Sequence, residues 1–167
     1  MRWRFLDRVT EFTETRAVAS AQTDFSQELF SDHFPSFPVT PGVLLIEMCA
    51  QLAGRLVEAR GSAAAGHLVF PVLTLVREAK FRGFVPPRTQ LQISTELEHL
   101  RPESALCSAR VESAEQRHAS MRLIFAFSPD GELEKGDRAV LEAFEREEFL
   151  RLGLDGFPPE SVRVKSR

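Results

Sequence analysis

The chain has no tyrosine, one tryptophan and only two cysteines among its 167 residues. Cys49 and Cys107 show neither metal-ligand spacing nor a disulfide framework, so we expect both to be small core residues. No apolar run approaches the roughly 20 residues of a membrane-spanning helix, and the start of the chain lacks the apolar core of a signal peptide. These absences predict a cytoplasmic location and point to no metal site.

One globular domain accounts for most of the chain. Apolar residues make up 43% of it, which is enough for one core but leaves little room for two. We expect this domain over residues 1–130 and a C-terminal extension over residues 131–167. Apolar positions among charged ones predict an amphipathic helix in the extension, docked on the domain or on a partner, before a basic tail at 161–167. These positions are Val140, Leu141, Phe144, Phe149 and Leu152.

Three segments in the second half alternate apolar and polar residues, as half-buried strands do. Their inward positions are Leu91, Ile93, Thr95 and Leu97; Ala105, Cys107, Ala109 and Val111; and Met121, Leu123, Phe125 and Phe127. With strand material between Leu68 and Val76, they predict an antiparallel meander. A helix over Val43–Gly54 is apolar on nearly every face, so we expect the sheet to curl around it in an α+β fold.

A loop with three prolines leads from His33 into this helix, which carries Glu47. Thr40 followed by Pro41 predicts the helix start, and Gly42 lets the backbone approach a ligand closely. The histidine is a proton acceptor near neutral pH, a carboxyl group on an apolar helix can donate a proton, and helix N-terminal amides polarise a carbonyl oxygen. These parts fit proton removal next to a carbonyl group.

Each of these residues also has a structural interpretation. His33 alone could be a loop histidine held by hydrogen bonds, and Glu47 could face a polar neighbour, but their spacing and the proline frame favour chemistry. Gln51 lies one turn beyond Glu47 on the same helix face, so we expect it to orient or satisfy that carboxyl group. The other histidines have no ligand spacing and are expected to be structural or solvated. They are His67, His99 and His118.

The window from His33 to Gly54 closely resembles the signature of the 3-hydroxyacyl-acyl-carrier-protein dehydratases of type II fatty acid synthesis, which have the hotdog fold. That family places a glutamate fourteen positions after its histidine, as Glu47 follows His33 here, and continues with an Ala-Gln pair at residues 50–51. Segments at Phe5–Val9 and Ala79–Pro86 also match. The resemblance covers roughly residues 5 to 128.

Four residues depart from the family pattern. Asp32 and Ser36 stand where glycines usually flank the His-Phe-Pro core, and Arg88-Thr89 replaces a glycine-aspartate pair. Asp32 places a carboxylate beside the proposed base, and a neighbouring negative charge favours the protonated imidazole.

The resemblance implies that water is eliminated from a (3R)-hydroxyacyl thioester on acyl carrier protein to give the trans-2-enoyl thioester. His33 would remove the alpha proton, Glu47 of the second subunit in a homodimer would protonate the leaving hydroxyl, and the Gly42 amide would stabilise the developing oxyanion. Val39 and Gln51 would support them. The phosphopantetheine arm carries the substrate, so no metal or redox cofactor is expected, and neither is a nucleic acid partner. A trimer of dimers is the larger assembly that the family suggests.

Two further expectations concern the substrate path. Phe37 and Phe84 are candidates for lining an acyl tunnel. A group of basic residues, offset only by Glu78, could dock an acidic carrier protein, although ordinary solvated charges explain it equally well. The group comprises Arg77, Lys80, Arg82 and Arg88.

Two other functions stay open. The same fold hosts acyl thioesterases, in which a helix carboxylate activates water, and release of a free thiol would identify that activity. A non-catalytic dehydratase-like subunit would bind acyl carriers without turnover, and Asp32, Ser36 and Arg88-Thr89 motivate this second alternative.

Overall fold

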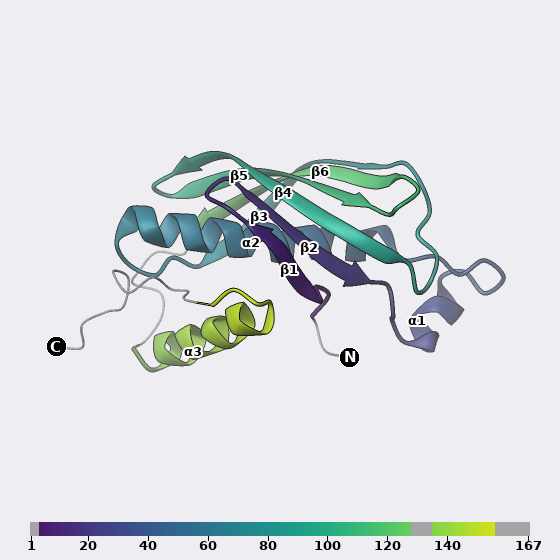
Figure 1. The fold of residues 1–167 in the computed structure, drawn as a ribbon, viewed down its shortest axis with the longest axis horizontal. Coiled ribbons are helices and arrows are strands. Elements are labelled where there is room, and N and C mark those ends of the chain that lie inside the picture. Colours follow the sequence, from purple (N-terminus) through teal and green to yellow (C-terminus); the bar gives the residue numbers. More distant parts are fainter. Residues whose placement is uncertain (1–3, 128–134, 156–167) are drawn as a thin grey trace.

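The structure is a computed structural model that describes residues 4–127 and 135–155. The described elements, in chain order, are β1 (Arg8–Phe12), β2 (Arg16–Gln22), α1 (Gln27–Asp32), α2 (Gly42–Ala65), β3 (Pro71–Phe81), β4 (Gln90–Arg101), β5 (Ser104–Glu112), β6 (Arg117–Phe127) and α3 (Lys135–Arg151). The strands form one antiparallel sheet in the order β1-β2-β4-β5-β6-β3. α2 lies across one face of this sheet, and α3 lies on the far side of α2 (Figure 1). The predicted α+β architecture is confirmed.

The alternation in β4, β5 and β6 places its apolar residues against α2. Ile93 pairs with Val111, and Cys107 pairs with Leu123, all four without solvent exposure. Both cysteines are buried free thiols, as expected. β3 differs, because most of its residues are exposed and, among the described strands, it pairs with β6 alone. This edge of the sheet is therefore the less covered one.

α2 extends well beyond the predicted Gly54, and its first residue is Gly42, one position after the Pro41 start that the Thr40-Pro41 pair predicted. Its N-cap is Pro41 instead of Thr40, and no side chain caps it. The Thr40 amide donates instead to the Val85 carbonyl at 2.7 Å, which holds this residue in the incoming loop. The helix passes through Gly54, since Leu56 and Val57 beyond it are fully buried, and burial outweighs the low helix propensity of glycine. It ends at Gly66, which has the left-handed conformation with φ of 74°.

α2 is the central helix that the sequence predicts, since every residue from 44 to 60 is buried or half-buried. Met48, Cys49 and Leu52 pack against the sheet with no exposure. Glu47 and Gln51 are half-buried on the side that faces away from these residues. Polar side chains therefore lie along this outer face of α2.

α3 lies in the region where the sequence predicts an amphipathic helix, and its C-terminal end packs on the rest of the chain. In and just after α3, Phe149 is 1% and Leu152 is 2% exposed, whereas Val140 is 72% exposed. The Val9 amide donates to the Leu152 carbonyl at 3.0 Å, which ties the end of α3 to β1. The expected boundary at residue 130 and the basic tail at 161–167 lie outside the described residues. Within the described ranges, no helix is long and apolar enough to cross a membrane.

Candidate active site

The His33 loop is closed by two hydrogen bonds between its ends. The Val39 amide donates to the His33 carbonyl at 3.1 Å, and Nδ1 of the His33 ring lies 3.1 Å from the Val39 carbonyl oxygen. The peptide bond between His33 and Phe34 is cis. Because Thr40 is tied to Val85 directly after this closure, the loop holds the half-buried imidazole just before α2 begins.

The contact with Val39 defines which nitrogen of His33 can accept a proton. A carbonyl oxygen only accepts hydrogen bonds, so Nδ1 is the donor in the neutral ring and Nε2 carries the lone pair. Asp32 is exposed at the end of α1, and among the described residues no ion pair joins it to His33. The departure at position 32 therefore leaves the arrangement of the ring intact.

Glu47 is held by a chain of hydrogen bonds from two parts of the sequence. Gln51 Nε2 donates to Glu47 Oε1 at 2.9 Å, and the Phe5 backbone amide donates to Gln51 Oε1 at 3.1 Å. The Gln51 amide is thereby fixed in orientation, because its oxygen already accepts from the N-terminal segment. Oε1 of Glu47 is an acceptor in this arrangement.

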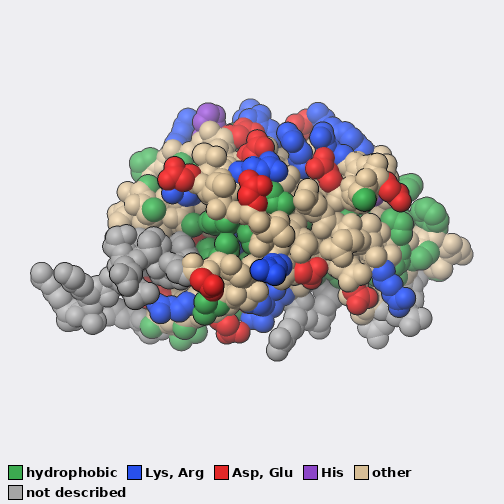
Figure 2. Space-filling model, in the orientation of Figure 1, with side chains coloured by type: hydrophobic (Ala, Val, Ile, Leu, Met, Phe, Trp, Pro, Cys, Tyr) green, Lys and Arg blue, Asp and Glu red, His purple; other side chains and the backbone are tan. Residues whose placement is uncertain are grey.

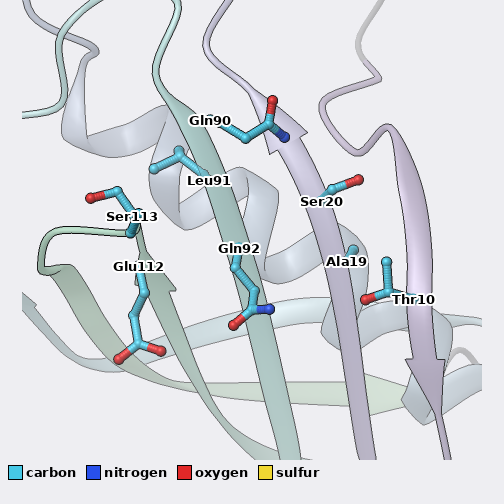
Figure 3. A pocket seen from close by; sticks show the side chains of 9 residues that line it. Thr10, Ala19, Ser20, Gln90, Leu91, Gln92, Glu112 and Ser113 are labelled. Carbon is cyan, nitrogen blue, oxygen red and sulfur yellow. The ribbon is translucent and has the colours of Figure 1, made fainter.

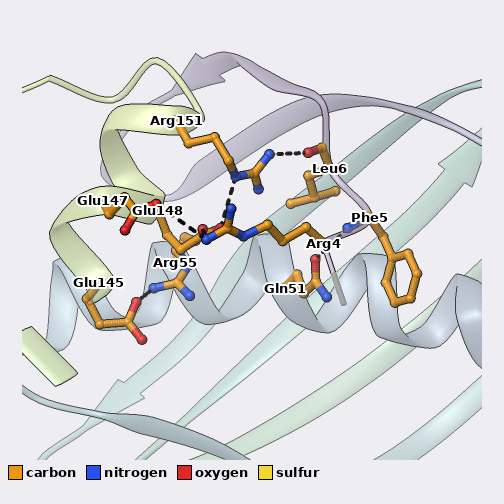
Figure 4. Close-up of polar contacts among 9 residues, drawn as sticks. All are labelled: Arg4, Phe5, Leu6, Gln51, Arg55, Glu145, Glu147, Glu148 and Arg151. Atoms are coloured by element: carbon orange, nitrogen blue, oxygen red, sulfur yellow. Dashed lines mark hydrogen bonds and ion pairs between the residues drawn. The ribbon is translucent and has the colours of Figure 1, made fainter. Parts of the chain in front are cut away.

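Ionic contacts from α3 hold the N-terminal segment in place (Figure 4). Arg151 donates to the Leu6 carbonyl at 2.8 Å, and Arg4 pairs with Glu148 at 2.6 Å. Arg151 also bonds Glu148 at 3.0 Å. The segment that orients Gln51 is thus anchored on both sides of Phe5 by the C-terminal extension.

A second ionic cluster joins α3 directly to α2. Arg55 pairs with Glu58 at 2.8 Å and forms an ion pair with Glu145 of α3, while its guanidinium lies 5.4 Å from the centre of the Phe149 ring. Burial raises the pKa of Glu58 to about 7, against the opposing effect of the Arg55 guanidinium. Sequence reasoning did not single out Arg55, Glu58 or Glu145; the i,i+3 spacing of the first two was the available signal.

A cavity of about 360 Å³ opens beside Glu47 between α2, the start of β3 and α3. Its polar lining includes Glu47, Gln51 and Arg55, and Phe70 and Leu73 contribute apolar surface. His33 is not among its lining residues. One copy of the chain thus places the predicted base and the predicted acid in separate surroundings.

The start of α2 lies against an aromatic ring. A Cβ atom at Gly42 would come within 3.1 Å of the Phe81 ring, so glycine allows this close contact. The predicted role of the Gly42 amide remains a prediction.

Phe37 and Phe84, the predicted tunnel residues, contact each other with ring centroids 5.6 Å apart. Large apolar side chains around the His33 loop and the start of α2 are unusually exposed: Phe34 55%, Phe37 59%, Val43 68%, Phe81 50% and Phe84 69%.

The predicted docking residues Arg77, Lys80, Arg82 and Arg88 are all exposed. Lys80 pairs with Glu78 at 2.5 Å and lowers the pKa of that carboxyl group. Lys and Arg side chains gather along the sheet side of the molecule, at the top of Figure 2. A depression there also includes basic residues that were not predicted to dock a carrier protein: His99, Arg101 and Arg122.

Another depression lies on the sheet away from α2 (Figure 3). Ser20, Gln92 and Glu112 line it, and it contains none of the predicted site residues. Within residues 4–127 and 135–155, no group of three or more His, Cys, Asp or Glu side chains could hold a metal ion.

The fold is shared with hotdog proteins of known structure. A hypothetical thioesterase protein from Streptococcus pneumoniae, solved with coenzyme A, superposes with a TM-score of 0.58 at 11% identity over 72% of this chain and 84% of that protein. The dehydratase heterocomplex ApeI:P from Xenorhabdus doucetiae superposes with a TM-score of 0.54 at 19% identity, over 71% of this chain and 94% of that protein. At these identities the likeness defines the fold.

Sequence comparison defines the family. The chain is 36% identical over 121 residues to the 3-hydroxyacyl-[acyl-carrier-protein] dehydratase FabZ of Streptococcus suis, which covers 72% of this chain and 84% of the relative. The FabZ of Streptococcus equi subsp. zooepidemicus is 34% identical over 122 residues, which span 73% of this chain and 85% of that relative. The model of the FabA-like domain matches residues 1–119. This chain therefore belongs to the FabA-like family.

Proposed function

We propose that this chain dehydrates a (3R)-hydroxyacyl thioester on acyl carrier protein to the trans-2-enoyl thioester, as part of fatty acid or related acyl biosynthesis. One observation carries the proposal. A chain similar to FabZ dehydratases over most of its length holds His33 with Nε2 as its proton acceptor, in the loop that leads to a clamped Glu47. The reaction transfers protons and releases water without a change in oxidation state, so acid and base groups suffice for it.

His33 takes the alpha proton of the substrate on Nε2. The Val39 carbonyl accepts a hydrogen bond from Nδ1, which keeps the ring in the tautomer with a free Nε2 lone pair. The same carbonyl stabilises the imidazolium that forms when Nε2 takes the proton. The backbone amide of Gly42, at the N-terminus of α2, polarises the thioester carbonyl while negative charge develops on its oxygen.

Glu47 donates the proton of Oε2 to the departing hydroxyl, which leaves as water. Gln51 holds Oε1 and thereby aims Oε2. After release of the enoyl product, His33 has gained one proton and Glu47 has lost one, so a net proton transfer between them restores the site.

A homodimer brings the two groups together. His33 and Glu47 lie in separate surroundings within one copy, and the edge strand β3 exposes Val72 by 53% and Leu75 by 52%. An apolar edge strand of eleven residues with one free side favours pairing with a second chain. We assign His33 of one subunit and Glu47 of the other to each site.

The carrier protein docks on the basic side chains at the end of β3 and in the following loop. Arg82 and Arg88 are exposed there, and Phe37 and Phe84 lie near the same loop as parts of the substrate entrance. An acidic carrier would find charge complementarity, which chiefly accelerates association.

Dehydration of a 3-hydroxyacyl carrier-protein thioester, followed by mass spectrometry, tests the proposal. We expect the wild type to remove one water, and His33→Ala and Glu47→Gln to lose this activity. Release of a free thiol without dehydration would instead identify a thioesterase. A folded dimer that leaves every chain length unchanged would be a non-catalytic acyl-carrier-binding subunit.

A further inference from the structure

α3 closes the cavity beside Glu47 from the side opposite the sheet. Leu141 and Glu145 of this helix line the cavity together with α2 and the start of β3. α3 lies outside residues 1–119, the part of the chain that matches the FabA-like domain. A segment additional to that match therefore forms one wall of the space next to the proposed catalytic acid.

The cavity has an apolar stretch that ends at charged groups. Its apolar lining comes from Phe70, Leu73, Phe125 and Leu141. At the far end Arg55 is held between Glu58 of α2 and Glu145 of α3 (Figure 4). Along an α-helix, Arg55 lies about 12 Å from Glu47 at the usual rise of 1.5 Å per residue. An alkyl chain that grows along α2 from Glu47 therefore meets an ionic cluster after this distance.

We propose that α3 sets the length of the acyl chain that this protein accepts, with Leu141 as the specificity-determining residue. This inference rests on the proposed function. The cavity volume of about 360 Å³ suits one small apolar ligand. Chains that end before Arg55 bury their methylene groups against Leu141 and Phe125. Longer chains would displace the contacts of Glu145 with Arg55, and those ion pairs resist loss of their partners.

The ionic cluster around Arg55 holds α3 in place beside the cavity. Arg55 contacts Glu58 and Glu145 and also packs over the Phe149 ring, which is 1% exposed. α3 is joined as well to the N-terminal segment through Arg151 and Leu6. A wall fixed at several points can discriminate between chains that differ by a few methylene groups.

Binding of a graded series of 3-hydroxyacyl pantetheine analogues, with an amide in place of the thioester, tests the inference by calorimetry. Leu141→Ala should raise the affinity for long analogues relative to short ones by about tenfold, and Leu141→Trp should lower the affinity for medium chains by a similar factor. Val140→Ala is the matched control, because Val140 is the neighbouring residue on α3 and is 72% exposed. It should leave the whole series unchanged within about twofold.

Opposite shifts from the two Leu141 variants would exclude a general loss of stability as their cause. Identical length profiles for wild type, both variants and the control would overturn the inference, and so would failure of every analogue to bind. Turnover of the carrier-bound thioesters, measured in parallel, separates the two proposals. A length-dependent response in binding without any dehydration would leave the wall in place and contradict the proposed activity.

Discussion

The His33 loop exposes its aromatic side chains, whereas the Glu47 face of α2 is covered by two other parts of the same chain. Phe34 and Phe37 in the loop are each more than half exposed. Gln51, in contrast, is clamped between Glu47 and the N-terminal segment, which α3 holds in turn. The comparison teaches that the acid side is completed within one chain, while the base side presents an apolar surface that a second copy can cover.

The largest effect is expected at His33. His33→Ala removes the only side chain assigned to proton abstraction, so kcat should fall by about 10² to 10⁴ or below detection. The dimer should persist, since the ring contributes one hydrogen bond to its own loop. Steady-state dehydration assays with light scattering measure both. His99→Ala, an exposed histidine on β4, is the control, and near-normal turnover by folded His33→Ala would remove this residue from the mechanism.

The second-largest effect is expected at Gln51. This residue acts through Glu47 and therefore tests the covered side of the site separately from the His33 loop. Gln51→Ala removes a hydrogen bond to a carboxyl group, so kcat should fall about 10- to 100-fold with KM little changed. Gln92→Ala on the outer sheet face controls for the loss of an amide. A change confined to KM would show that Gln51 contacts the acyl chain instead of positioning the acid.

On the stability side, Glu58 gives the covered region a pH dependence. Its pKa is raised from the ordinary value of 4.5 to about 7 in the folded state, so the folded protein binds more protons than the unfolded chain between these two pH values. The free energy of unfolding should therefore fall by about 3 kcal/mol as the pH rises from 4.5 to 7, and stay level above. Urea unfolding across this range should show a smaller fall for Glu58→Gln than for wild type. An unchanged slope in Glu58→Gln, equal to that of the exposed control Glu103→Gln, would contradict this assignment.

The smallest effect concerns the carrier protein at the open side. The double substitution Arg82→Glu, Arg88→Glu should weaken carrier binding several-fold at low salt, and the difference should shrink as salt screens the charges. Surface plasmon resonance with the acyl carrier protein would measure it. Unchanged binding at low salt would reject this docking surface, and Arg110→Glu on β5 serves as the matched control.

Local patterns predicted those parts of the fold that local chemistry determines. Alternation identified β4, β5 and β6, because one face of each strand packs on α2. The start of α2 was missed by one residue, since the bond from Thr40 to Val85 joins positions far apart in the chain. The continuation of α2 past Gly54 depends on burial under the sheet, which no local rule reports.

In the candidate site, too, contacts within one helix were predicted and contacts between distant segments were not. Gln51 was predicted beside Glu47 from helix geometry alone, and the structure places it there. The contact of Phe5 with Gln51 and the docking of Glu145 on Arg55 arise from tertiary packing of the two chain ends. Such contacts between distant segments leave no periodic signal, so the covering of the Glu47 face could be found only in three dimensions.

We propose above that each site takes His33 from one subunit and Glu47 from the other. Coexpression of His33→Ala and Glu47→Gln chains with different tags, followed by two-step purification, yields the heterodimer. One of its two sites then contains both intact groups, so the heterodimer should show about half of the wild-type turnover although each mutant homodimer is inactive. A folded heterodimer without activity would contradict the shared site.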